Sequence, residues 1–208
     1  MKYLDLDGNN KIEQTVSAND IKDQRIIGNS LPRYTYSIRL NAEWNGIDFS
    51  VFFQGVGKQD WYPSSDAFAF WGPYSSPAPS FIPKDFLADV WSVDNPDAYF
   101  PRPRGYIAWT DGRSLSSVNN RYLQSLAYSR LKNLTVGYTL PVKWLSKIHV
   151  QKARLYFSGE NLLTLDRLDT DYIDPEAAAA GTNWKTGKTN ALSYPFSKTY
   201  SFGIDITF

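Results

Sequence analysis

The chain has 208 residues, no cysteine and a net charge of +1, and 16% of its residues are aromatic. The lack of cysteine excludes a disulfide framework and a thiolate site, and the near-neutral charge gives no electrostatic reason to expect a nucleic-acid partner. No apolar run approaches the roughly 20 residues that a membrane-spanning helix needs, and the polar start does not have the pattern of a signal peptide, so any targeting segment is expected elsewhere.

The chain begins with an acidic stretch. Asp5, Asp7 and Asn9 alternate like the first ligands of a calcium-binding loop, in which alternate oxygen ligands converge on one hard cation. Asn10 stands where such loops have glycine, and Val16 stands where they have a bidentate glutamate. The sequence therefore leaves two alternatives: calcium bound by Asp5, Asp7 and Asn9, or a solvated turn without metal.

Residues 32–55 predict a β-hairpin. From residue 33 to residue 44 apolar and polar side chains alternate with a period of two, and Asn45-Gly46 follows, the pair best suited to the positive φ angles of a type I′ turn. One side of the hairpin is apolar, and the other carries charged residues, namely Arg33, Arg39, Glu43 and Asp48. Such a pair of faces suits a strand between hydrocarbon and a water-filled lumen.

Residues 56–122 predict a long loop rich in proline, serine, glycine and aromatic side chains, with a short helix at residues 84–93. Loops of this length are usually functional. Flat apolar rings with polar edges suit sugar rings or a peptide, but the same rings could pack the loop itself or lie at a membrane interface. The candidates for contact with a ligand or partner are Trp61, Tyr62, Trp71, Tyr74, Trp91 and Trp109.

Residues 123–163 predict two strands joined by a compact turn at 141–150, with Arg154 and Glu160 on the polar side. A second long loop is expected at 164–195. Its acidic side chains, Asp174 among them, are expected to be solvated, with local hydrogen bonding in the Asp174-Pro175-Glu176 turn. Within it, residues 181–189 imitate a phosphate-binding loop, but five residues instead of four separate the glycines and no helix pattern follows. We therefore expect an exposed loop tip there and no nucleotide site.

The last predicted strand, at residues 196–208, has one apolar face and ends on an aromatic residue. Its apolar positions are Tyr200, Phe202, Ile204, Ile206 and Phe208. Five strands cannot close a barrel, and an unpaired strand edge has no hydrogen-bond partners in lipid. The pattern therefore predicts that these strands belong to a larger barrel.

Four groups of segments carry a resemblance to a known family. They are Asp5 to Ile12 with Asp23 to Asn29, Phe49 to Gly55, Arg130 to Pro141, and Tyr156 to Thr164 with Asp174-Pro175-Glu176. In this order, and with Phe208 at the end, they resemble the C-terminal part of the SusC/RagA family of TonB-dependent outer-membrane transporters found in Bacteroidota. The resemblance covers nearly the whole chain.

The resemblance implies an all-β fold, the C-terminal antiparallel strands of a plugged transmembrane β-barrel of roughly 22 strands. It implies extracellular loops at 1–31, 56–122 and 164–195, and a barrel-assembly signal in the terminal strand at 196–208. It also implies a SusD-like surface lipoprotein as partner, and energy from the TonB complex through an N-terminal part that this chain lacks.

In that family the imported nutrients are oligomers, most often glycans, with peptides as the other class. The implied location is the outer membrane of a Gram-negative bacterium. No enzyme is expected, because one histidine, no cysteine and no nucleophile elbow leave no catalytic set, and no cofactor is expected apart from the calcium considered above. The alternative is a soluble or surface-attached β-sandwich, rich in aromatic residues, that binds carbohydrate.

Overall fold

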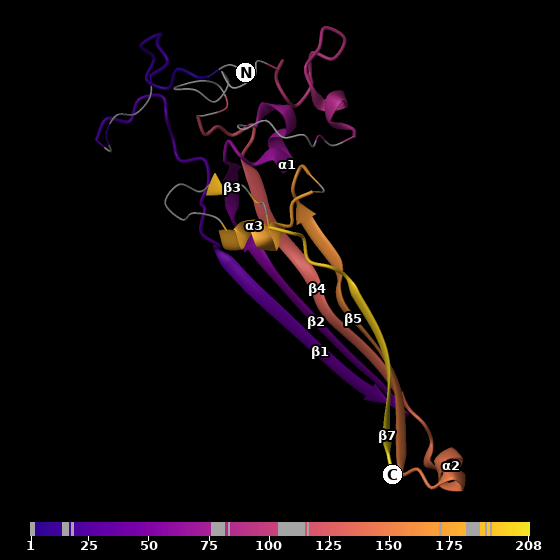
Figure 1. Cartoon of the computed structure of the whole chain (residues 1–208). Helices are drawn as coiled ribbons and strands as arrows, with labels where there is room; N and C mark the ends of the chain where they lie inside the picture. Colours follow the sequence, from indigo (N-terminus) through magenta and orange to yellow (C-terminus); the bar gives the residue numbers. More distant parts are fainter. Residues whose placement is uncertain are drawn as a thin grey trace.

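The computed structural model describes residues 3–13, 17, 19–75, 82, 84–103, 115, 117–170, 172–181, 188–189, 191 and 193–208. Long antiparallel strands dominate it, in the order β1-β2-β4-β5-β7. They are β1 (Tyr34–Trp44), β2 (Ile47–Lys58), β4 (Gln124–Thr139), β5 (Lys152–Arg167) and β7 (Thr199–Thr207). Figure 1 shows them as one long, curved sheet. All five predicted strands are confirmed, although the last begins at Thr199 and not at residue 196.

The sheet is open in the part of the chain that the structure describes, because β1 pairs only with β2 and β7 pairs only with β5. None of the helices in the described ranges has the length and apolar character needed to cross a membrane. The architecture is therefore an antiparallel all-β sheet with two free edges, as the sequence predicts.

The two faces of the sheet differ in chemistry. Asp48, Gly137 and Tyr156 are register partners across β2, β4 and β5, so these positions share one face of the sheet. Arg154, two residues from Tyr156 on β5, and its register partner Asp205 on β7 lie on the same face. We call this the polar face. The other face exposes large apolar side chains, including Ile38, Leu40, Phe49, Val136, Leu155, Phe202 and Ile204. An apolar surface this extensive marks contact with something other than water.

Short connections lie at one end of the sheet. Asn45 and Gly46 join β1 to β2 with φ angles of 49° and 84°, which confirms the predicted turn with two positive φ values. Helix α2 (Val142–Leu145) and the 3₁₀ turn η4 (Ser146–Ile148) connect β4 to β5. In Figure 1 this end of the sheet also holds the C-terminus.

The other end carries a folded cap built mainly from the described residues between 59 and 126. Its elements are β3 (Asp60–Pro63), α1 (Phe68–Trp71) and the 3₁₀ turns η1 (Gly72–Tyr74) and η2 (Phe86–Asp89). Strand β3 pairs with β4 and, in parallel, with β6 (Lys188–Thr189). The helix predicted at residues 84–93 is wrong in length and type, because only the 3₁₀ turn η2 forms there. We call this region the aromatic cap, since its buried core consists mainly of aromatic rings.

Two of the register shifts in the sheet lie close to helix α3 (Pro175–Gly181). Opposite β2, one extra residue, Lys132, is inserted in β4, and opposite β4, an extra residue is inserted in β5 at Asn161, which has a φ of 52°. Inserted residues of this kind bend a strand and re-aim its side chains. Helix α3 contacts β4 in this region.

Candidate functional site

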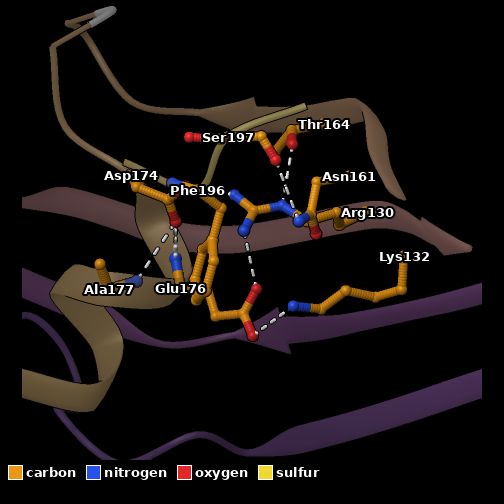
Figure 2. Close-up of polar contacts among 9 residues, drawn as sticks. All are labelled: Arg130, Lys132, Asn161, Thr164, Asp174, Glu176, Ala177, Phe196 and Ser197. Carbon is orange, nitrogen blue, oxygen red and sulfur yellow. Dashed lines mark hydrogen bonds and ion pairs between the residues drawn. The ribbon is translucent and has the colours of Figure 1, made fainter. Parts of the chain in front are cut away.

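A network of ion pairs joins β4 to the loop between β5 and β7 (Figure 2). Arg130 donates from Nη2 to Asp174 Oδ2 at 2.6 Å and from Nη1 to Glu176 Oε2 at 2.8 Å. Lys132 donates from Nζ to the other oxygen of Glu176 at 2.8 Å. The remaining guanidinium nitrogen, Arg130 Nε, donates to Thr164 Oγ1 at 2.9 Å. We call Arg130, Lys132, Asp174 and Glu176 the loop anchor.

The centre of the loop anchor is shielded from solvent. The side chains of Arg130 and Asp174 are only 2% and 5% exposed, whereas Glu176 and Lys132 are partly exposed. The Arg130 guanidinium lies 5.0 Å from the ring centroid of Phe196, and Lys132 Nζ lies 4.6 Å from it. Removing one partner of a buried pair leaves an uncompensated charge and costs about 3–5 kcal/mol. Loss of either Arg130 or Asp174 alone is therefore expected to destabilise the docked loop.

Local sequence explains how Asp174 reaches Arg130. Its Oδ1 accepts the backbone N–H groups of Glu176 and Ala177 at 2.9 and 3.2 Å, so Asp174 caps α3, and Pro175 occupies the first helical position, where it is favoured. Its Oδ2 remains free to accept from Arg130. The hydrogen bonds at the start of α3 thus fix the Asp174 carboxylate in the orientation that its ion pair with Arg130 needs.

The loop anchor lies on the polar face of the sheet. Arg130 is the register partner of Gln54, which lies an even number of residues from Asp48 on an unbroken stretch of β2. Residues separated by an even number of positions on a strand share a face. The loop carrying α3 therefore folds back over the polar face, and Figure 1 shows α3 lying across the upper part of the sheet. The expected solvated position of Asp174 is wrong, because the side chain is buried against β4. The local hydrogen bonding expected in the Asp174-Pro175-Glu176 turn is confirmed.

A second ion pair lies on the polar face nearer the short connections. Arg154 donates from Nη2 to Asp48 Oδ2 at 2.6 Å and from Nη1 to Asp205 Oδ2 at 3.1 Å. The Asp48 and Arg154 side chains cross directly over Gly137, where any side chain would collide with them. Asp48 and Arg154 thus share the polar face as predicted, and their pairing accounts for the glycine between them.

The predicted aromatic residues lie mostly inside the aromatic cap. Trp61, Tyr62, Trp71 and Tyr74 are buried, Trp91 is half-buried, and Trp109 lies outside the described residues. Trp61 Nε1 donates to Thr189 O at 3.1 Å and Trp71 Nε1 donates to Ser64 O at 3.0 Å, so the polar edges of both indoles are satisfied within the chain. Desolvation by burial raises the pKa of the Tyr62 and Tyr74 hydroxyls. Packing is thus observed for the first four, and contact with a ligand or partner stays a prediction.

The acidic turn brings its predicted residues together. Carboxylate oxygens of Asp5, Asp7 and Asp23 lie within 4.8 Å of one another, and Asn9 Nδ2 donates to Asp7 Oδ2 at 3.0 Å. Backbone N–H groups also bind these carboxylates: Asp5 accepts those of Gly8 and Asn10, each at 2.6 Å. Both the calcium alternative and the metal-free turn fit this geometry, so calcium stays a prediction. Asp23 was not among the predicted ligands, although it belongs to a segment that carries the family resemblance.

The apolar residues of the terminal strand lie where the alternation predicts. The side chains of Tyr200, Phe202, Ile204, Ile206 and Phe208 are all exposed, and the first four lie on the apolar face of β7. Their role as a barrel-assembly signal stays a prediction.

Sequence reasoning missed the loop anchor as a unit. Its residues all lie in segments that carry the family resemblance, but Arg130 and Asp174 are 44 positions apart. The sequence does show two basic residues, Arg130 and Lys132, on a predicted strand, and two acidic residues on either side of Pro175. Their contact depends on how the loop folds, which no local pattern reveals.

The curated relatives of the chain are both named TonB-dependent receptors. No protein-family model matches the chain. It is 32% identical to TonB-dependent receptor P3 of Formosa agariphila over 99% of its own length, and 27% identical to TonB-dependent receptor P26 of the same organism over 89%. The chain spans only 19% and 18% of the lengths of these two relatives.

Solved structures show the same fold. The RagAB peptide importer in its open-open state matches 94% of the chain with a TM-score of 0.59 and 23% identity. A structure of the RagAB peptide transporter matches 96% with a TM-score of 0.57, also at 23% identity. The chain covers 19% and 20% of the chains in these two structures.

Proposed function

We infer from these likenesses that the chain is part of a SusC/RagA-like TonB-dependent receptor, and we propose that it forms adjacent strands of an outer-membrane barrel that imports oligomeric nutrients. The observation that carries the proposal is the likeness to TonB-dependent receptor P3 along almost the entire chain. The two chemically distinct faces of an open, antiparallel sheet support it, because such a sheet needs neighbouring strands and an apolar environment.

In this proposal the apolar face contacts lipid and the polar face lines the interior of the barrel. Leu40 and Phe202 would face hydrocarbon, whereas Asp48 and Arg154 would face inward. The short connections would lie on the periplasmic side and the aromatic cap outside the cell, since outer-membrane barrels have short periplasmic turns and longer external loops.

The proposed substrates are peptides or glycans. The solved structures that match the chain are named as peptide importers, which supports peptides, while the family resemblance favours glycans. The proposed partner is a SusD-like surface lipoprotein, with energy from the TonB complex. A catalytic role is not proposed, because the relatives are named as receptors and importers and not as enzymes.

Fractionation and uptake test the proposal. The full-length receptor, tagged in its native host, is expected in the outer-membrane fraction and to need detergent for extraction. Cells that carry it are expected to accumulate fluorescein-labelled peptides or oligosaccharides, and deletion of either the receptor or TonB is expected to abolish this accumulation. A full-length protein that stays dispersed without detergent would instead support the soluble carbohydrate-binding alternative.

A further inference from the structure

The loop between β5 and β7 is much longer than the connection of two neighbouring strands requires. Neighbouring antiparallel strands can be joined by a few residues, yet here the connection runs from residue 168 to residue 198. Its described part folds back over the polar face at the loop anchor. We call the described residues of this connection, 168–170, 172–181, 188–189, 191 and 193–198, the inner strap.

We propose that the inner strap is a fixed inner wall of the import passage, that Arg130 holds it in position, and that it limits the size of the oligomer that passes. This inference deepens the proposed function and rests on it, because the polar face lines a passage only if the sheet belongs to a transport barrel.

The strap is attached to the sheet on both of its limbs. On the outgoing limb, Asp174 and Glu176 bind Arg130 (Figure 2). On the returning limb, the Phe196 N–H donates to Asp174 Oδ2 at 3.3 Å, and Asn161 Nδ2 donates to Ser197 O at 3.3 Å. One buried carboxylate, that of Asp174, therefore receives both Arg130 and the returning limb. Loss of Arg130 is expected to loosen the two limbs together.

The strap is also joined to the aromatic cap. Asp169 and Gln124 exchange two hydrogen bonds, each of 3.1 Å. Ile173 and Ala178 belong to the buried core of the cap, and β6 of the strap pairs with β3. A segment with these contacts behaves as part of the folded cap and not as an independently moving external loop.

The two inserted residues near the anchor aim the strand side chains at the strap. Lys132 is the extra residue of β4, and both it and Arg130 reach Glu176. Asn161 is the extra residue of β5, and its side chain binds the returning limb. Inserted residues that re-aim side chains are often found at functional positions of barrels. Both irregularities thus serve the same contact between sheet and strap.

Cysteine accessibility in the full-length receptor tests whether Arg130 holds the strap. Ala178 is fully buried and Tyr194 is 88% exposed, so single substitutions Ala178→Cys and Tyr194→Cys, each in a receptor without other reactive cysteines, report on the docked and the free surface of the strap. On intact cells, a membrane-impermeant maleimide is expected to label Tyr194→Cys rapidly and Ala178→Cys slowly.

Adding Arg130→Met is expected to speed labelling of Ala178→Cys at least about tenfold, because buried Asp174 loses its cation and the segment opens locally. Arg154→Met is the matched control: it removes another arginine that pairs with two carboxylates on the same face, but it is far from the strap and should leave labelling unchanged. Slow labelling in the Arg130→Met receptor would overturn Arg130 as the positioning residue, and rapid labelling of Ala178→Cys alone would overturn the docked strap.

Uptake tests the size limit. Cells with the wild-type receptor are given two length-graded sets of fluorescein-labelled probes, one of peptides and one of oligosaccharides. The Arg130→Met receptor is expected to accept longer members of the set that the wild type imports. If Arg130→Met speeds the labelling of Ala178→Cys but leaves the size limit unchanged, only the size-limiting role of the strap is overturned. Absence of wild-type uptake of both sets would contradict the proposed import function, while the labelling result would still decide the position of the strap.

Discussion

Arg130 and Arg154 lie on the same face of the sheet and each binds two carboxylates, but their surroundings differ. The Arg130 side chain is 2% exposed, whereas that of Arg154 is 22% exposed. Water screens the second pair and lowers its contribution, since exposed ion pairs contribute only about 0–1 kcal/mol. Water does not screen the Arg130 pair in this way, because its partner Asp174 is buried too. Loss of Arg130 is therefore expected to destabilise the structure more than loss of Arg154.

Trp71 lies at the centre of the aromatic cap. Its ring centroid is 4.8 Å from that of Phe70 and 5.1 Å from that of Tyr122, both in edge-to-face geometry. Trp71→Ala removes these contacts and leaves a cavity, so it is expected to reduce the stability of the cap by about 3–5 kcal/mol. Hydrogen exchange of the cap amides in the full-length receptor measures the loss. Val93→Ala, at an exposed position of the same region, should leave exchange almost unchanged; equal protection in both variants would contradict the prediction.

Asp23 gives the acidic turn a defined dependence on pH. The backbone N–H groups of Glu13 and Leu6 donate to its carboxylate and hold the pKa of Asp23 below its ordinary value. A carboxylate with a lowered pKa stabilises the fold above its unfolded pKa, and this stabilisation is lost as the pH falls through the folded pKa. The turn is therefore expected to stay ordered at neutral pH and to open only at pH values below the ordinary range for aspartate.

Limited proteolysis of the N-terminal turn as a function of pH, with an acid-tolerant protease, measures this opening. Asp23→Asn provides the comparison: the amide at position 23 cannot ionise, so the pH dependence of cleavage should be weaker in this variant than in the wild type, while Asp5 and Asp7 still titrate in both. Cleavage of the wild-type turn that is equally fast at neutral and at acidic pH would refute the assignment.

Among the elements, the long strands were predictable and the cap was not. The hairpin of β1 and β2 follows from alternation along each strand and from Asn45-Gly46, all of which are local signals. Elements of three or four residues, such as α1, β3 and η2, have too few residues for a periodic pattern and exist because tertiary packing supports them. The family resemblance supplied the architecture, while the position of the strap depended on contacts between distant segments.

The turn between β1 and β2 allows an element-scale prediction. Gly46 has a φ of 84°, and a Cβ atom there would lie 2.9 Å from the backbone oxygen of Thr139. Gly46→Ala is therefore expected to destabilise the hairpin by about 1–2 kcal/mol, the cost of forcing a side chain into the left-handed region. The folded fraction of the refolded full-length receptor across a urea series measures the change. Asn45→Gly, which keeps a residue that tolerates the positive φ of position 45, should have little effect, and an equal loss in both variants would contradict this account.

At the scale of the whole molecule, the buried core lies at one end of the sheet and not along its apolar face. The described buried cluster lies in the aromatic cap and in the strap residues packed against it, whereas the apolar face of the sheet remains exposed. A sheet buries its apolar face against another layer in a water-soluble domain, and no described segment forms such a layer here. The cap can therefore account for its own stability, while the sheet depends on lipid and on the rest of the barrel.

Neighbouring positions of β1 test that dependence directly. Leu40 and Asn41 are adjacent, so their side chains lie on opposite faces, Leu40 opposite Val51 and Asn41 opposite Ser50. If the apolar face contacts hydrocarbon, Leu40→Arg is expected to destabilise the barrel by about 2–4 kcal/mol, whereas Asn41→Arg faces a polar interior and should be tolerated. The altered gel mobility of unheated barrels, measured on outer-membrane fractions of the full-length receptor, gives the folded fraction. Equal loss with both substitutions, or with neither, would show that the apolar face of this sheet does not contact lipid.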